Sequence, residues 1–311
     1  MSKAYTKRTK DSTIVAFNKK LEKKRIQLEK NNDLMEGYRY IFFYYAVGEN
    51  ITAGNREVLR KNRIIWQNAM LDYINEDSGS ISQFLDKIVA YVQKMPLRKT
   101  FRLKDKRREK SLAEYRGRYF LQINGSKKIK PEHAIEYHLI HKECQKIGKF
   151  IAYEFPLDLK NYFGGIDLIA YNSERKELRL IELKKVNFKE SKESCEMFLR
   201  AYTEIITYRA CFDMLLKNLE TRKLLQDELN KLGEELEFKI DLDDVKVINC
   251  IFGPESLYED VDDNLREFVK TTKNESYKVE LYSLSVHEEE IMKHPIGHSE
   301  IMIEIESYDF H

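Results

Sequence analysis

The chain lacks the features that mark secreted, zinc-binding and membrane-spanning proteins. Its 311 residues include four cysteines, scattered and without a Cys-x-x-Cys pair, which argues against a zinc finger and a disulfide framework. No segment approaches the roughly 18 to 20 apolar residues of a membrane span, and no apolar segment of a signal peptide follows the basic start. These absences predict a cytoplasmic globular protein that has no contact with a membrane.

Charge is abundant and unevenly distributed. Charged residues make up 34% of the chain, yet the formal net charge is only +2. Residues 1–130 contain 30 Lys and Arg against 14 Asp and Glu, so the remainder of the chain contains 24 against 38. A basic half joined to an acidic half indicates a nucleic-acid partner. Attraction between the two halves, or a solvated basic face, would give the same asymmetry.

Helical patterns dominate the N-terminal third of the chain. Apolar residues recur at helical spacing in 13–36, 55–77 and 80–95, and Ser80 is placed to cap the last of these helices. We therefore expect a mostly helical region here.

A dense basic run at 97–120 follows these helices. It includes Arg107 and Arg108 and is interleaved with aromatic residues, a composition that suits phosphate contacts and base stacking. A charged, solvated helix is the alternative. We divide the chain at the polar turn that comes next, into a basic nucleic-acid-binding region, 1–125, and a second domain, 126–311.

The second domain begins with helix and strand patterns in the order α-β-β-β-α-β, which predicts an α/β fold with a mixed central sheet. A C-terminal extension with one helix and two strand-like runs follows this core. The expected core helices are 131–148 and 191–236, and the expected core strands are 149–159, 164–172, 177–186 and 244–253.

Three ionisable residues stand in the most apolar part of this core. Asp167 begins one expected strand, and Glu182 and Lys184 lie in the next. Burying such groups costs several kcal/mol unless they are paired or bound to a metal. If the two strands form a hairpin, Glu182 and Lys184 project from the same face, near Asp167. Two close carboxylates need a cation, and their hard oxygen atoms favour Mg²⁺ or Mn²⁺.

The segments "GGID" and "LIELKK", in this element order, resemble the PD-(D/E)XK nuclease superfamily over about residues 131–253. Ile166 stands where the family name has proline. The resemblance implies a restriction-endonuclease-like fold in which Asp167 and Glu182 hold the metal with the backbone carbonyl of Leu183, and Lys184 is the catalytic lysine.

The superfamily often has a further glutamate in the preceding helix, for which Glu136 is our choice, with Glu132 and Glu143 as rivals. Many members carry Gln-x-x-x-Tyr in the following helix, and Glu204 and Tyr208 stand at that spacing. A glutamate at the glutamine position would repel phosphate.

Other residues of the second domain are candidate nucleic-acid contacts. They are Lys185, Arg200, Tyr202, Tyr208 and Arg209.

We therefore expect a Mg²⁺- or Mn²⁺-dependent nuclease, most readily an endonuclease acting on DNA in restriction, defence or repair. A homodimer is among the assemblies that the resemblance implies. The alternatives are a nucleic-acid-binding or assembly module that keeps the fold without turnover, and a protein-interaction scaffold.

Overall fold

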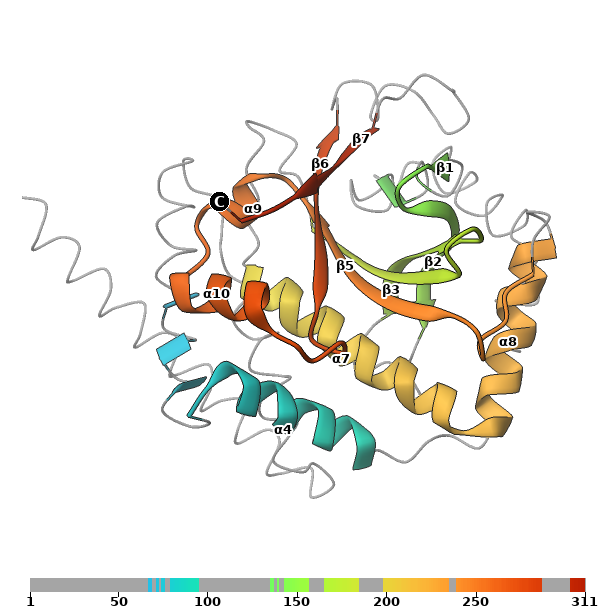
Figure 1. Ribbon diagram of the computed structural model, residues 1–311, viewed down its shortest axis with the longest axis horizontal. Helices are drawn as coiled ribbons and strands as arrows, with labels where there is room; N and C mark the ends of the chain where they lie inside the picture. Colours follow the sequence, from blue (N-terminus) through green and yellow to red (C-terminus); the bar gives the residue numbers. More distant parts are fainter. Residues whose placement is uncertain are drawn as a thin grey trace, which may run out of the picture.

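A mixed seven-stranded β-sheet organises the described part of the chain (Figure 1). The computed structural model describes residues 67–68, 71–72, 74–75, 79–94, 135–136, 139, 143–156, 165–184, 198–234, 239–286 and 303–310. The strands are β1 (Glu143–Cys144), β2 (Gly148–Pro156), β3 (Gly165–Asn172), β4 (Glu177–Leu183), β5 (Lys246–Gly253), β6 (Val279–Val286) and β7 (Ile303–Tyr308). The helices are α4 (Ile81–Lys94), α7 (Phe198–Lys217), α8 (Leu219–Glu234), α9 (Ser256–Glu259) and α10 (Asp263–Thr271). The prediction of an α/β fold with a mixed sheet is confirmed, and the narrower likeness to restriction endonucleases stays a prediction.

The strands lie in the sheet in the same order as in the chain. Strands β1 to β4 pair antiparallel, β5 runs parallel to β4 and to β6, and β7 returns antiparallel along β6. The helices α7 and α8 connect β4 to β5, because two parallel strands need a long crossover. The two strands of the expected C-terminal extension are thus part of the same sheet.

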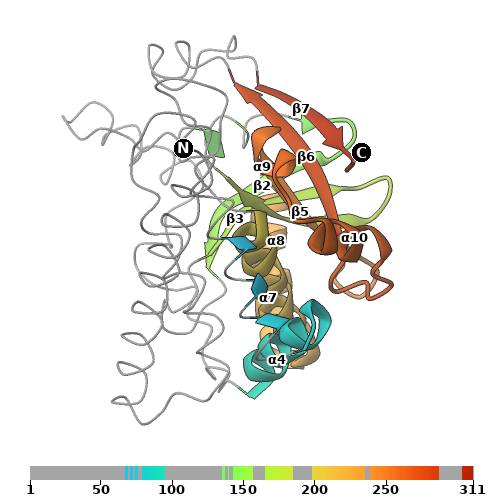
Figure 2. The same cartoon turned by 90° about the vertical axis from the view of Figure 1, so that its left-hand side faces the viewer.

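Helix α7 lies along one face of the sheet, and α4 packs on the side of α7 that faces away from it (Figures 1 and 2). The side chains of Phe84, Leu85 and Ile88 in α4 are fully buried in the cluster that includes α7. The side chain of Ser80 accepts a hydrogen bond from the backbone N–H of Gln83 (3.2 Å), which confirms the predicted N-cap. The described part of the basic N-terminal region therefore shares one core with the second domain.

Strand β4 is buried on both faces. Leu178 and Leu180 belong to the apolar cluster on the α7 side, and Ile181 and Leu183 belong to a second cluster on the opposite face. Side chains alternate along a strand. Glu182, between Ile181 and Leu183, therefore faces α7.

The helix expected over 131–148 is wrong at its C-terminal end. Glu143 and Cys144 form strand β1, which turns back and pairs with the start of β2. Gly148 begins β2 with a φ of +100°, and a Cβ there would lie 2.3 Å from the carbonyl oxygen of Tyr171. The glycine that reads as a helix stop is thus required by a hairpin, because only glycine fits this backbone conformation against β3.

None of the helices within the described ranges has the length and apolar character needed to cross a membrane.

Candidate functional site

Asp167 and Glu182 meet where the β3–β4 hairpin opens. Backbone pairing extends to Leu168 and Ile181, and one further step in this register places Asp167 across from Glu182. There the carboxylate oxygen Oδ2 of Asp167 accepts the backbone N–H of Leu183 (2.7 Å). The Asp167 side chain thus accepts the N–H group of Leu183 where the backbone pairing of β3 and β4 ends. This contact holds the Asp167 carboxylate beside β4.

Lys184 joins these residues from the same face of β4. Its Nζ donates to Glu182 Oε1 and to Glu204 Oε2, both at 2.5 Å. Glu204 comes from α7, which lies over this face, and its other oxygen accepts from Nε of Arg200 (3.1 Å). We call Asp167, Glu182, Lys184, Arg200 and Glu204 the carboxylate cluster.

The two glutamates of the cluster are both almost completely buried, but their pKa values are shifted in opposite directions. The side chains of Glu182 and Glu204 are 4% and 6% exposed. Burial and then the negative charge of Asp167 raise the pKa of Glu182 well above its ordinary value, and Lys184 offsets this only in part. Burial alone would raise the pKa of Glu204 too, but the positive charges of Lys184 and Arg200 outweigh it and lower this pKa to about 2.

One oxygen of the cluster is left over. Oε2 of Glu182 is buried and has no hydrogen-bond partner among the described residues. A buried acceptor without a donor is costly, so such an atom calls for a ligand or a proton. Because the negative charge of Asp167 also acts on the Glu182 carboxyl group, a divalent cation that prefers oxygen ligands fits this pair of carboxylates.

A larger acidic cage is absent from the part of the chain that the structure describes. No group of three or more His, Cys, Asp or Glu side chains is placed there to hold a metal ion. Glu204 lies close by, but both of its oxygens already accept from cations. The structure brings the carboxylates of Asp167 and Glu182 to one end of the hairpin, and their role as metal ligands together with the backbone carbonyl of Leu183 stays a prediction.

Glu136 is the third predicted acidic residue, and its side chain is fully buried. Its neighbours Ile135 and Leu139 pack in the apolar cluster on the face of the sheet opposite to Glu182. The contribution of Glu136 to the site stays a prediction. Of its two rivals, Glu143 lies in strand β1 and Glu132 lies outside the described residues.

The structure buries two of the predicted nucleic-acid contacts in the core. Tyr202 is fully buried, its ring stacks on Phe198, and its hydroxyl donates to the carbonyl of Tyr277 (2.8 Å). Tyr208 is also buried in the apolar cluster. Both rings pack inward because α7 is covered on one side by the sheet and on another by α4.

Arg200 remains a candidate phosphate contact, since its side chain is 17% exposed and lies at the edge of the carboxylate cluster. Arg209 has a different place, because it bonds Asp213 and the carbonyl of Val247. The other predicted contacts, Lys185, Arg107 and Arg108, lie outside the described residues.

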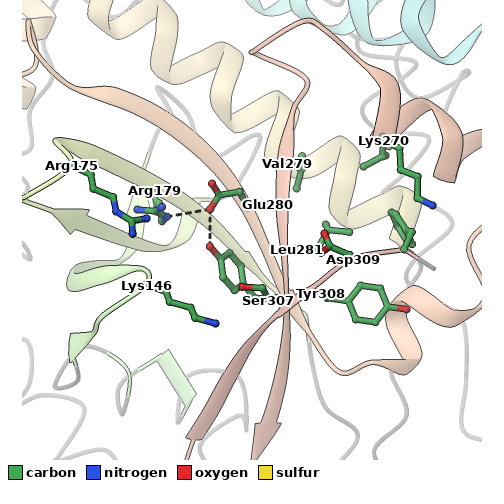
Figure 3. Close-up of a pocket in the computed structure, with 13 residues that line it drawn as sticks. Lys146, Arg175, Arg179, Lys270, Val279, Glu280, Leu281, Ser307, Tyr308 and Asp309 are labelled. Atoms are coloured by element: carbon green, nitrogen blue, oxygen red, sulfur yellow. Dashed lines mark hydrogen bonds and ion pairs between the residues drawn. The ribbon is translucent and has the colours of Figure 1, made fainter.

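A pocket of about 550 Å³ lies elsewhere, along β6 and the end of β7, and contains a second group of charges (Figure 3). Arg179 is buried at its wall with every nitrogen bonded: to Glu280 (3.4 Å), Glu177 (2.7 Å) and the carbonyl of Ile147 (3.2 Å). The hydroxyl of Tyr282 donates to Glu280 (2.7 Å). Because these buried charges already have partners, we do not place the functional site in this pocket.

Glu204 is the residue of the cluster that sequence analysis did not assign to the site. Its spacing to Tyr208 matches Gln-x-x-x-Tyr, but a carboxylate there is expected to repel phosphate; the structure pairs it with Lys184. The sequence feature that indicates an ion pair at Glu204 is its spacing of four residues from Arg200, which places both side chains on one face of a helix.

Comparison of the chain with protein-family models, curated proteins and solved structures gives no match. The likeness to the nuclease superfamily therefore depends on the residues and the element order given above.

Proposed function

We propose that the chain is a metal-dependent nuclease that hydrolyses phosphodiester bonds, with DNA as the favoured substrate. One observation carries this proposal. The Asp167 carboxylate is held opposite a buried Glu182 whose Oε2 has no partner among the described residues, and Lys184 pairs with the other oxygen of Glu182. These observations support an acidic site in which one carboxylate oxygen has no donor among the described residues and a lysine lies beside it.

Each residue has a role in this proposal. Asp167, Glu182 and the Leu183 carbonyl would hold Mg²⁺ or Mn²⁺, which when bound lowers the pKa of a water molecule and draws charge from a phosphate oxygen. Lys184 would stabilise the negative charge that develops on the phosphate. Arg200 would contact a phosphate oxygen from the edge of the cluster, because a guanidinium matches phosphate geometry.

The test is a cleavage panel with single-stranded, double-stranded and branched DNA and with RNA, each in Mg²⁺, in Mn²⁺ and in EDTA. We expect cleavage that needs the divalent ion and that is lost in Asp167→Ala and Lys184→Ala. Both variants should still bind the substrate in a gel-shift assay. Lys176→Ala is the matched control, because it removes an exposed lysine of the β3–β4 turn that pairs only with the exposed Asp244 among the described residues.

Full activity in both site variants would overturn the assignment. Binding of nucleic acid without cleavage under any ion would favour the non-catalytic binding module instead. Absence of any binding at low salt would favour a protein-interaction scaffold, because phosphate contacts are strongest there.

A further inference from the structure

The ammonium of Lys184 is shared between two buried carboxylates from different elements. Glu182 approaches from the same strand and Glu204 from α7, each at 2.5 Å. A hydrogen bond to a charged group contributes more than one between neutral groups, so each of these bonds matters at such burial. Lys184 is therefore held from two sides, and it can lose one partner and keep the other.

The two ion pairs of Lys184 affect whether Glu182 can bind a metal ion. Its Oε1 accepts from Lys184, and its Oε2 has no hydrogen-bond partner in the part of the chain that the structure describes. A divalent cation at Oε2 brings positive charge next to the ammonium group on the same carboxylate, and the two cations repel each other. Without another anion nearby, Lys184 would compete with the metal for Glu182.

We propose that Glu204 is a positioning residue that retains Lys184 when the Glu182 carboxylate turns to a divalent cation. The inference rests on the proposed function, because it concerns the same metal site. Glu204 is not itself a metal ligand here: one of its oxygens accepts from Lys184 and the other from Arg200. Arg200 thus orients Glu204, Glu204 holds Lys184, and Glu182 is left for the ion.

The test measures Mn²⁺ binding directly, by electron paramagnetic resonance of free Mn²⁺, so that it does not depend on catalysis. Four proteins form a double-mutant cycle: wild type, Glu204→Gln, Lys184→Met and the double variant. We expect Glu204→Gln to weaken Mn²⁺ binding on the order of tenfold, because Lys184 then stays on Glu182. In the Lys184→Met background the same change should cost less than about threefold.

Asp213→Asn is the matched control. It removes one carboxylate from the same helix, where Asp213 pairs with Arg209, and it should leave Mn²⁺ affinity unchanged. Glu204→Asp is a second, milder variant that keeps the charge and shortens the reach to Lys184. It should also weaken binding, which a role through charge alone would not produce. The unfolding transition of each variant verifies that the protein is folded.

An equal loss from Glu204→Gln in both backgrounds would overturn the inference, because Glu204 would then act as a ligand or through its charge. The proposed metal site would still stand in that case, provided that the wild-type protein binds Mn²⁺. A wild type that takes up no Mn²⁺ at millimolar concentration would overturn both this inference and the proposed metal site.

Discussion

Two groups of charged residues lie on opposite faces of strand β4, and they differ in which of the paired side chains are exposed to solvent. Around Arg179 the cation is buried, while Glu177 and Glu280 are 15% and 42% exposed. In the carboxylate cluster the anions Glu182 and Glu204 are buried as deeply as the lysine between them. With every group ionised, each set has one more carboxylate than cations. The excess negative charge therefore meets solvent on one face and protein on the other.

This difference separates a structural ion pair from a candidate site. Every nitrogen of Arg179 has an acceptor, so its positive charge is already paired within the protein. Glu182 has a buried oxygen to which no described residue donates, and burial together with the negative charge of Asp167 makes its ionisation costly. Strongly perturbed carboxyl groups of this kind cluster at functional sites more often than elsewhere.

The largest expected effect comes from Asp167→Asn. This substitution keeps an acceptor for the N–H of Leu183 but removes the negative charge that repels the ionised Glu182 carboxylate. We expect cleavage to fall by about 10² to 10³, the size seen when one preorganised electrostatic group is lost. The free energy of unfolding of the metal-free protein should rise by about 1 kcal/mol. Cleavage rates and urea unfolding measure the two quantities, and a loss of both activity and stability would contradict a functional role for this charge.

The next effect concerns the other face. Arg179→Leu removes the hydrogen bonds of a buried cation to Glu177, Glu280 and the carbonyl of Ile147, and we expect the free energy of unfolding to fall by about 2 kcal/mol with Mn²⁺ affinity unchanged. Arg222→Leu is the control, because its pair with Asp243 is exposed and should contribute less than about 1 kcal/mol. A loss of Mn²⁺ binding in Arg179→Leu would show that the two faces are coupled.

The smallest effect is a pH dependence. The pKa of Glu182 is raised in the folded protein, so the folded state binds this proton more tightly than the unfolded state does. Its contribution to stability is complete below the ordinary carboxyl pKa and is lost as pH rises toward the raised value, by at most about 1.4 kcal/mol per pH unit.

Urea titrations of the metal-free wild type and of Glu182→Gln, from pH 5 to pH 8, check this contribution. The variant should lack this downward slope, and identical slopes would contradict the burial of an uncompensated carboxyl group. Glu204 acts in the opposite direction, since its pKa is lowered to about 2 and its contribution is lost only as pH falls below the ordinary range.

Much of the hairpin could be read from the chain because its causes are local. Apolar residues on both sides of a polar turn predict β3 and β4, and strand alternation predicts that Glu182 and Lys184 share a face. The end of the 131–148 helix was missed because a glycine with positive φ serves a helix end and a hairpin equally well.

The sequence by itself determined that two carboxylates and a lysine gather at one end of a hairpin, since the period of two and the register act over a few residues. Only the tertiary structure decided which parts of α7 face them. Helical spacing groups Arg200, Glu204 and Tyr208 but does not give the rotation of the helix against the sheet. That rotation follows from packing α7 between the sheet and α4, and it turns Tyr202 inward and brings Glu204 to Lys184.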